Sequence, residues 1–232
     1  ARGRLTEIRA RDLRFTGEET VSFFHQTSLL KLTDEMVATL NGRAEGWAVG
    51  LQLAGLAMQN QPDLQNFIEN FRGSNRYIVD YLAEEVIRQQ PEEIRRFLIQ
   101  TSVLERLNAG ICEAVTGQKD SQQILDQLEQ ENLFLIALDD ERHWYRYHHL
   151  FADYLKAGLD KSTQADAYKS AASWHEQQDS FFESVPYALS SEDYDFAAGV
   201  IERALQHGIT WSGGEVGTLT DWLQRLPASI LE

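Results

Sequence analysis

The chain has little cysteine, few basic residues for its many acidic ones and no long apolar run, and each shortage excludes a class of protein. Its single cysteine, Cys112, leaves no disulfide framework within the chain. The balance of 21 Lys and Arg against 36 Asp and Glu gives a net charge of −15, which argues against broad contact with a nucleic-acid backbone. The longest strand-type apolar run, Leu133–Leu138, is far too short to span a membrane. We therefore expect a soluble protein of a reducing, cytoplasmic compartment.

The sequence also lacks the loop that binds nucleotide phosphates in ATPases. The pattern G-x-x-x-x-G-K-[ST] does not occur, and the nearest text, Gly117–Asp120, has neither the spacing nor the hydroxyl. We expect no enzymatic activity from this chain on its own. Residues 1–16 begin as a loop and a short strand with no partner strand close in sequence, as though taken from the edge of a larger sheet.

What the sequence does contain is mostly helical periodicity. Thr16 and Glu19 have the spacing of a capping box, which predicts a helix start. A second helix is predicted from about Thr33 to a stop at Asn41-Gly42. Apolar residues lie on nearly every side of Gly46–Met58, which predicts a helix buried on most sides. Further helices are predicted to open at Pro62, to span Arg76–Ile87 and to open at Pro91.

The order of elements then changes to that of a winged-helix domain. Helices predicted at Asn108–Val115 and Gln122–Glu131 precede a buried strand, Leu133–Leu138. A turn and a return strand, His143–Tyr147, lead into another amphipathic helix that starts near Leu150. The helix that would enter DNA, Gln122–Glu131, carries three acidic residues and no Lys or Arg. We therefore predict a winged helix that acts as a protein module rather than as a DNA reader.

After Gly158 the pattern is helical again, with small residues alternating with large ones. This alternation predicts stacked helical pairs, with a turn at Trp211–Gly214 and a last helix over Leu219–Leu226. The predicted fold class is mainly α: a helical lid domain and a winged-helix domain with a small β-hairpin, followed by the start of a tetratricopeptide-like helical-repeat region.

The junction between the aromatic return strand and the next helix, within Trp144–Leu155, is the best candidate for function. A helix start leaves backbone N–H groups unpaired and positively polarised, so it readily faces an anion, and a histidine adds a proton that can be gained or lost. His148 is therefore a candidate site residue, with a capping or packing role as the alternative. Trp47 is by default a core aromatic.

A zinc site is the other chemistry that this region suggests. Imidazoles and a carboxylate can bind zinc. However, side chains alternate on a strand, so His143 and His148 point to opposite faces, which argues against a metal site. The residues concerned are His143, His148, His149 and Asp153.

Five ordered stretches resemble the large ATP-binding, LuxR-type, MalT-like transcriptional regulators, which belong to the signal-transduction ATPases with numerous domains. The resemblance covers most of the chain and is weaker after about Lys161. The stretches are Asp12–Thr16, Glu45–Ala54, Phe71–Ile78, Asn132–Leu135 and Tyr145–Phe151.

The resemblance implies a position inside a multidomain switch. In that family an NTPase domain with the P-loop precedes a helical lid, a winged helix, a helical-repeat sensor and a LuxR-type DNA-binding domain. It implies that residues 1–16 hold the last strand of the NTPase domain, 17–75 the lid, 76–160 the winged helix and 161–232 the start of the sensor. The implied partners are the NTPase domain and sensor of the same protein, further copies of the parent and an inducer. Direct contact with nucleic acid or membrane is not implied for this chain.

The resemblance also implies roles for particular residues. Tyr147–Leu150 resembles the methionine-histidine-aspartate motif and implies that His148 contacts the phosphate of ADP, with His149 standing where the wider class has aspartate. Gly46 and Trp47 resemble the Gly-x-Pro element near the adenine, with Ala48 in place of proline. ATP or ADP would be the cofactor of the full-length protein, a signalling ATPase, and none is expected in this chain.

The implied function is regulation of transcription. ADP would favour a closed form, and ATP with inducer an open form that oligomerises and activates a promoter. Two alternatives stay open: a stand-alone helical and winged-helix adaptor that binds proteins, and a metal-dependent hydrolase that uses the histidine cluster.

Overall fold

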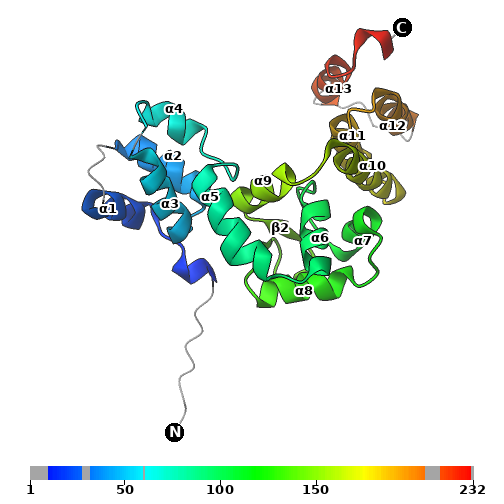
Figure 1. The fold of residues 1–232 in the computed structure, drawn as a ribbon. Helices are drawn as coiled ribbons and strands as arrows, with labels where there is room; N and C mark the ends of the chain where they lie inside the picture. The colour runs from blue at the N-terminus through cyan, green and yellow to red at the C-terminus, as the bar shows by residue number, and fades with distance from the viewer. Residues whose placement is uncertain (1–9, 28–31, 60, 207–214, 231–232) are drawn as a thin grey trace. The chain divides into compact units, whose positions relative to one another are not determined.

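The computed structural model describes residues 10–27, 32–59, 61–206 and 215–230 (Figure 1). In these ranges nearly all regular structure is helical, which confirms the mainly α prediction. The contacts divide the chain into two compact units, and the division passes through the β-hairpin. The first unit comprises residues 1–90, 130–134 and 147–157, and the second comprises 91–129, 135–146 and 158–232.

The first unit is built from short helices. Among its described residues, the 3-10 turn η1 is followed by five α-helices, a π-helical turn η2 that continues α5, a second 3-10 turn η3, and the later helix α9. Their bounds are η1 Ala10–Leu13, α1 Gly17–Thr27, α2 Asp34–Ala44, α3 Ala48–Met58, α4 Leu64–Glu69, α5 Arg76–Tyr81, η2 Leu82–Val86, η3 Ile87–Gln89 and α9 His149–Ala157.

The start of α1 follows the predicted capping box. The Glu19 backbone N donates to Thr16 Oγ1 at 3.2 Å, and the Thr16 N donates to Glu19 Oε2 at 2.8 Å. Each residue satisfies a backbone donor that the helix start leaves unpaired. The sequence pattern alone was sufficient for this helix boundary.

The end of α2 differs from the prediction. The helix continues through Gly42, where a stop was expected, and ends where Glu45 and Gly46 take left-handed φ values of 47° and 69°. A glycine inside a helix costs only about 1 kcal/mol relative to alanine. The buried Leu40 and Ala44 on either side of Gly42 favour continued helix.

The apolar helix α3 is buried on most sides, as predicted. Leu51, Ala54 and Met58 are fully buried, while Leu56 is 42% exposed. Exposure is confined to Gln52 and Leu56 on the outer face, and the other residues of the helix are buried or half-buried. An apolar residue on a surface is common in folded proteins, so composition alone does not fix burial.

The second unit holds most of the predicted winged helix and the helices that follow it. Along the chain, α6, α7, α8, the two strands and α9 come in the predicted winged-helix order. The bounds are α6 Glu92–Thr101, α7 Ala109–Thr116, α8 Ser121–Gln130, β1 Leu135–Ala137, β2 Tyr145–Tyr147, α10 Lys161–Gln177, α11 Phe181–Ser190, α12 Tyr194–Gln206, α13 Glu215–Gln224 and the 3-10 turn η4 Ala228–Ile230.

The hairpin is shorter and less buried than predicted. Within β1 no residue is fully buried, and Leu138 just beyond it is 39% exposed. The prediction of a buried strand over Leu133–Leu138 was therefore wrong. The return strand supplies the buried contacts instead, since Tyr145 is 1% exposed and exchanges two 2.8 Å backbone hydrogen bonds with Leu107. His143 precedes β2, in a turn where its backbone N donates to the Asp139 carboxylate.

The hairpin packs against the first long helix that follows it. Trp144 lies edge-to-face on Trp174 of α10, with ring centroids 6.4 Å apart, and the Arg106 guanidinium lies 4.9 Å from the Trp144 ring. An aromatic pair of this geometry adds about 1 kcal/mol beyond the area that it buries. These contacts join the wing to α10 within one unit.

Helices α10 to α13 share a core of their own. α10 packs on α11 and α11 on α12, around small and branched residues such as Ala188 and Val200. α11 contains Pro186 within the helix. The predicted turn at Trp211–Gly214 lies outside the described residues, and the last predicted helix is observed as α13. Among the described helices, none combines the length and apolar character needed to cross a bilayer.

Candidate functional site

His148 joins the return strand to α9, as the sequence predicts. Its backbone N donates to Phe134 O at 2.8 Å, and its carbonyl accepts from Phe151 N and Ala152 N at 3.0 and 2.9 Å. These bonds fix the residue on both sides and begin the helix. The residue is only 4% exposed.

The two ring nitrogens of His148 differ in their surroundings. Nε2 lies 2.9 Å from the Ala44 carbonyl oxygen, which can only accept, so Nε2 carries the hydrogen and donates. Nδ1 is buried and has no hydrogen-bond partner. The neutral ring therefore presents an unused lone pair at Nδ1.

Burial keeps this histidine neutral. Desolvation lowers the pKa of His148 from 6.5 to about 4, although the nearby Glu45 charge and the Ala44 bond oppose the shift. The rings of Trp47 and Phe134 flank the imidazole, with centroids 5.9 and 6.0 Å away and edge-to-face geometry. At neutral pH His148 is an uncharged group held by packing and one hydrogen bond.

The anion expected at the start of α9 is the chain's own Glu45 carboxylate. Oε1 accepts from the His149 backbone N at 3.2 Å and lies 3.0 Å from His149 Nδ1. Oε2 lies 3.3 Å from Arg14 Nη1. The Glu45 side chain is 8% exposed and His149 is 54% exposed, so the carboxylate is the inner partner. Sequence reasoning missed Glu45, although it immediately precedes the Gly46-Trp47 pair.

Gly46 stands where two backbones meet. Its φ is 69°, and a Cβ there would lie 2.5 Å from the Phe15 carbonyl oxygen. Phe15 N donates to Gly46 O at 2.8 Å. Only glycine fits both the left-handed conformation and the close approach.

Trp47 is the N-cap of α3 and lies in an aromatic cluster. Its ring centroid is 5.0 Å from that of Phe134 and 5.7 Å from that of Tyr81. A Cβ at Gly50 would come within 2.4 Å of the indole, so that glycine makes room for it. The structure thus brings Gly46, Trp47 and His148 into one neighbourhood, with Trp47 half-buried in the packing role that is the default for a tryptophan.

The four residues of the zinc alternative have separate partners. His148 bonds to Ala44 O, His149 to Glu45, and Asp153 accepts from Gly73 N at 3.4 Å. Among the residues that the structure describes, no group of three or more His, Cys, Asp and Glu side chains is placed to hold a metal ion.

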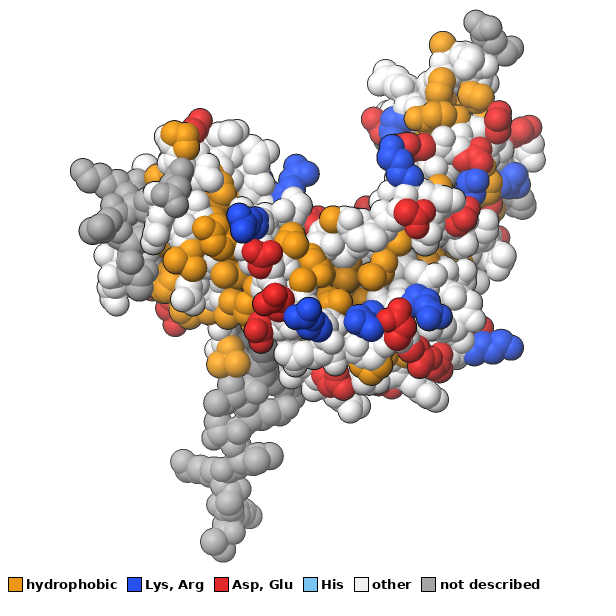
Figure 2. All heavy atoms as spheres, in the orientation of Figure 1, with side chains coloured by type: hydrophobic (Ala, Val, Ile, Leu, Met, Phe, Trp, Pro, Cys, Tyr) orange, Lys and Arg blue, Asp and Glu red, His pale blue; other side chains and the backbone are white. Residues whose placement is uncertain are grey.

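The helix equivalent to a DNA-recognition helix, α8, uses its acidic residues within the chain. Glu129 accepts from the Tyr145 hydroxyl at 3.3 Å and lies 3.3 Å from Arg142. Asp126 accepts from Gln122 at 2.8 Å. On the face drawn in Figure 2, Lys and Arg side chains are scattered among acidic ones rather than gathered over one element. Such a surface does not favour a phosphate backbone.

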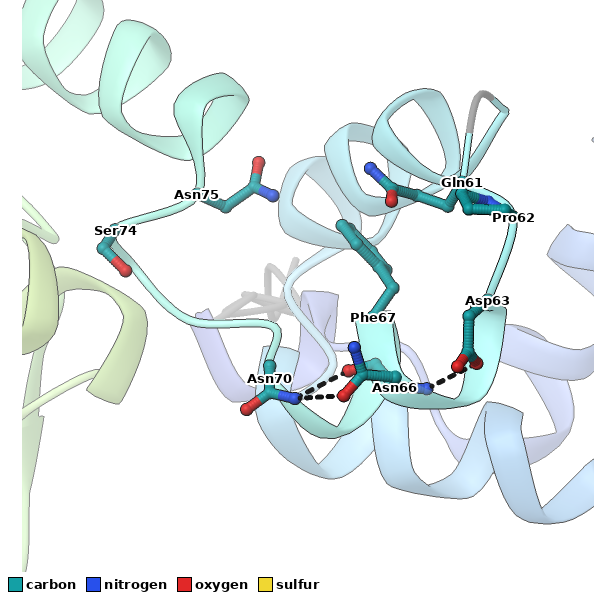
Figure 3. A pocket seen from close by; sticks show the side chains of 8 residues that line it. All are labelled: Gln61, Pro62, Asp63, Asn66, Phe67, Asn70, Ser74 and Asn75. Carbon is teal, nitrogen blue, oxygen red and sulfur yellow. Dashed lines mark hydrogen bonds between the residues drawn. The ribbon is translucent and has the colours of Figure 1, made fainter.

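A polar pocket of about 340 Å³ lies beside α4, away from the residues predicted to be functional (Figure 3). Its walls carry carboxamides, one carboxylate and the Phe67 ring, and the Asn70 amide donates to Asn66 across its floor. None of its lining residues is basic, so it does not suit a phosphate. They are Gln61, Pro62, Asp63, Asn66, Phe67, Asn70, Ser74 and Asn75.

Comparison with known families identifies the central part of the chain. Residues 83–167 match the MalT winged helix domain. Over these residues the chain is similar to that domain. It is 31% identical over 233 residues to the HTH-type transcriptional regulator MalT of Vibrio parahaemolyticus, which covers 98% of the chain and 26% of that protein. The chain is also 31% identical over 238 residues to MalT of Klebsiella pneumoniae, which covers 99% of the chain and 26% of that protein.

A second kind of protein contains a similar stretch. The serine/threonine-protein kinase PknK of Mycobacterium tuberculosis is 29% identical over 230 residues, which covers 98% of the chain and 20% of the kinase. The chain thus spans about a quarter of the length of the MalT relatives and a fifth of PknK.

Proposed function

We propose that this MalT-like chain is the regulatory segment of a multidomain, ATP-dependent LuxR-type transcription activator. The observation that carries the proposal is that the likeness to MalT regulators extends over 98% of the chain rather than over the winged helix alone. The chain itself performs no catalysis in this account. It couples nucleotide state and an inducer to oligomerisation of the parent protein and to transcription, in the cytoplasm.

The proposed domains follow the order of the family. Residues 1–16 would hold the last strand of the NTPase domain, 17–75 the lid, 76–160 the winged helix and 161–232 the start of a helical-repeat sensor. The family match at residues 83–167 supports the winged-helix assignment. The shared core of α10 to α13 supports the assignment of a repeat region.

His148 is proposed to sense the phosphate of ADP in the full-length protein. Its buried, unpaired Nδ1 supports this role, because such an atom is normally satisfied by a partner. A phosphate oxygen accepts hydrogen bonds, so the Nδ1 contact needs a second proton on the ring while Nε2 donates to Ala44. The negative charge of the phosphate itself favours that proton.

Gly46 and Trp47 are proposed to lie on the adenine side of the same site. Gly46 permits the close crossing with Phe15, and Trp47 holds the His148 ring in place. ADP would then stabilise a closed form through a contact that the open form lacks. ATP and inducer would break this contact and favour the open form.

The test is basal transcription by the full-length regulator. We expect His148→Ala to raise activity without inducer, whereas His143→Ala, at an exposed position in the turn, should leave it unchanged. If His148→Ala changes neither basal transcription nor ADP retention, the proposal is refuted.

A protein-interaction adaptor is the second candidate. The likeness to a stretch of PknK favours it, since that relative is named as a kinase rather than as a transcription regulator. The two candidates predict different domains on either side of this chain in the same open reading frame. The activator requires a P-loop upstream and a basic helix-turn-helix downstream, and the absence of both would leave the adaptor.

A further inference from the structure

The start of α9 already holds an anion, supplied by a residue 104 positions earlier in the chain. The Glu45 carboxylate accepts from the His149 backbone N and also meets the His149 ring and the Arg14 guanidinium. A carboxylate at a helix start is favourable because the first amide groups are unpaired and positively polarised. Here it comes from the end of α2 rather than from α9 itself.

The backbone of Glu45 is held in an unusual conformation. Its φ of 47° is left-handed, at the C-cap of α2 where glycine is the usual residue, and Gly46 comes only after it. A left-handed conformation costs a residue with a side chain roughly 1–2 kcal/mol. The chain therefore keeps glutamate at a position where glycine would relieve the strain.

The neighbouring His148 supplies an independent observation that points to a ligand. The residue is only 4% exposed, and its Nδ1 is buried and has no partner. The rings of His148 and His149 lie 5.7 Å apart. An unpaired polar atom thus adjoins a helix start whose first amide is already bonded to a carboxylate.

We propose that Glu45 is a built-in competitor for the phosphate group at the start of α9. Its carboxylate holds the His149 amide and the Arg14 guanidinium, two donors that a phosphate beside His148 needs. This inference rests on the proposed phosphate contact of His148. The bond between Glu45 and His149 then marks the phosphate-free state, and removal of the carboxylate strengthens phosphate binding.

The first test uses the 232-residue chain with inorganic phosphate as the probe. The amide resonance of His149 is followed by NMR during a phosphate titration of the wild-type chain and of Glu45→Gln. Glu45→Gln keeps the shape of the side chain and removes its charge. We expect a saturable shift at His149 and an affinity about tenfold higher than in the wild-type chain, the gain of one charge-assisted hydrogen bond.

Two further variants complete this test. Glu84→Gln removes an exposed carboxylate on η2 and should behave as the wild-type chain. Glu45→Asp keeps the charge on a shorter side chain and should bind phosphate with intermediate affinity, which also covers the case that Glu45→Gln does not fold. Equal phosphate affinities in the wild-type chain and the Glu45 variants would overturn the proposal.

The second test separates this inference from the proposed function. In the full-length protein, Glu45→Gln should raise ADP affinity, and His148→Ala should lower it. If His148→Ala lowers ADP affinity but Glu45→Gln does not raise it, the competitor role is wrong and the sensor role stands. If His148→Ala has no effect while Glu45→Gln still exposes a phosphate site in the chain, the sensor role is wrong and the competition stands.

Discussion

The buried imidazole of His148 should make the stability of its unit depend on pH in a defined window. Its pKa falls from 6.5 to about 4 on folding because burial disfavours the charged ring. The folded state thus binds this proton less readily than the unfolded chain. The stability that comes from the neutral ring is fully present above pH 6.5, is lost as the pH falls through that value, and stops falling near pH 4.

The size of the effect follows from the two pKa values. Between about pH 7.5 and about pH 5, the linkage removes about 2 kcal/mol from the free energy of unfolding. His148→Gln should abolish this part of the pH dependence, since its side-chain amide can still donate to Ala44 O but does not titrate. At neutral pH the variant should be less stable than the wild-type chain, because it loses the ring contacts with Trp47 and Phe134.

Urea unfolding at several pH values, followed by circular dichroism and by tryptophan fluorescence, measures this difference. Burial also lowers the pKa of His175, which lies in the other unit and titrates in both proteins, so only the difference between the two pH profiles reports His148. His143→Gln, at an exposed position in the other unit, is the control for the loss of a histidine outside the site. Parallel profiles for the wild-type chain and His148→Gln would show that His148 does not cause this pH dependence.

Four further substitutions test the local structure and packing described above, by their effect on the free energy of unfolding. Gly46→Ala should cost more than about 2 kcal/mol because a Cβ would meet the Phe15 carbonyl, whereas Gly42→Ala, with open space around it, should stabilise by roughly 0.5–1 kcal/mol. Thr16→Ala should cost about 1 kcal/mol through loss of the α1 capping box, and equal melting temperatures would contradict that cap. Trp144→Ala should cost about 2 kcal/mol and increase hydrogen exchange in α10, and unchanged exchange there would show that the wing does not support that helix.

The elements that the sequence predicted correctly are those set by local pattern. The capping box of Thr16, the helix that starts at Asn108 and the helical periodicity of α6 to α8 each involve residues within a few positions of one another. Local signals were weaker for α2, where burial of Ala44 extended the helix past Gly42.

The candidate site was only half predictable. The motif around His148 is visible in the sequence, but the partner of its Nε2 atom and the anion beside it come from residues 44 and 45, 104 positions away. No periodicity or spacing links such distant residues, so Glu45 was not recognised. The prediction of a buried first strand failed for a related reason. The buried contacts of β2 are made with Leu107 rather than with β1 alone.

The central claim is that His148 reads the nucleotide state of the parent protein. The most direct measurement is the nucleotide content of the full-length protein as purified, determined for the wild type and for His148→Ala. The account predicts stoichiometric ADP in the wild type and a large loss of ADP in the variant. A wild-type protein that carries no nucleotide, or a variant that retains as much ADP as the wild type, would contradict it.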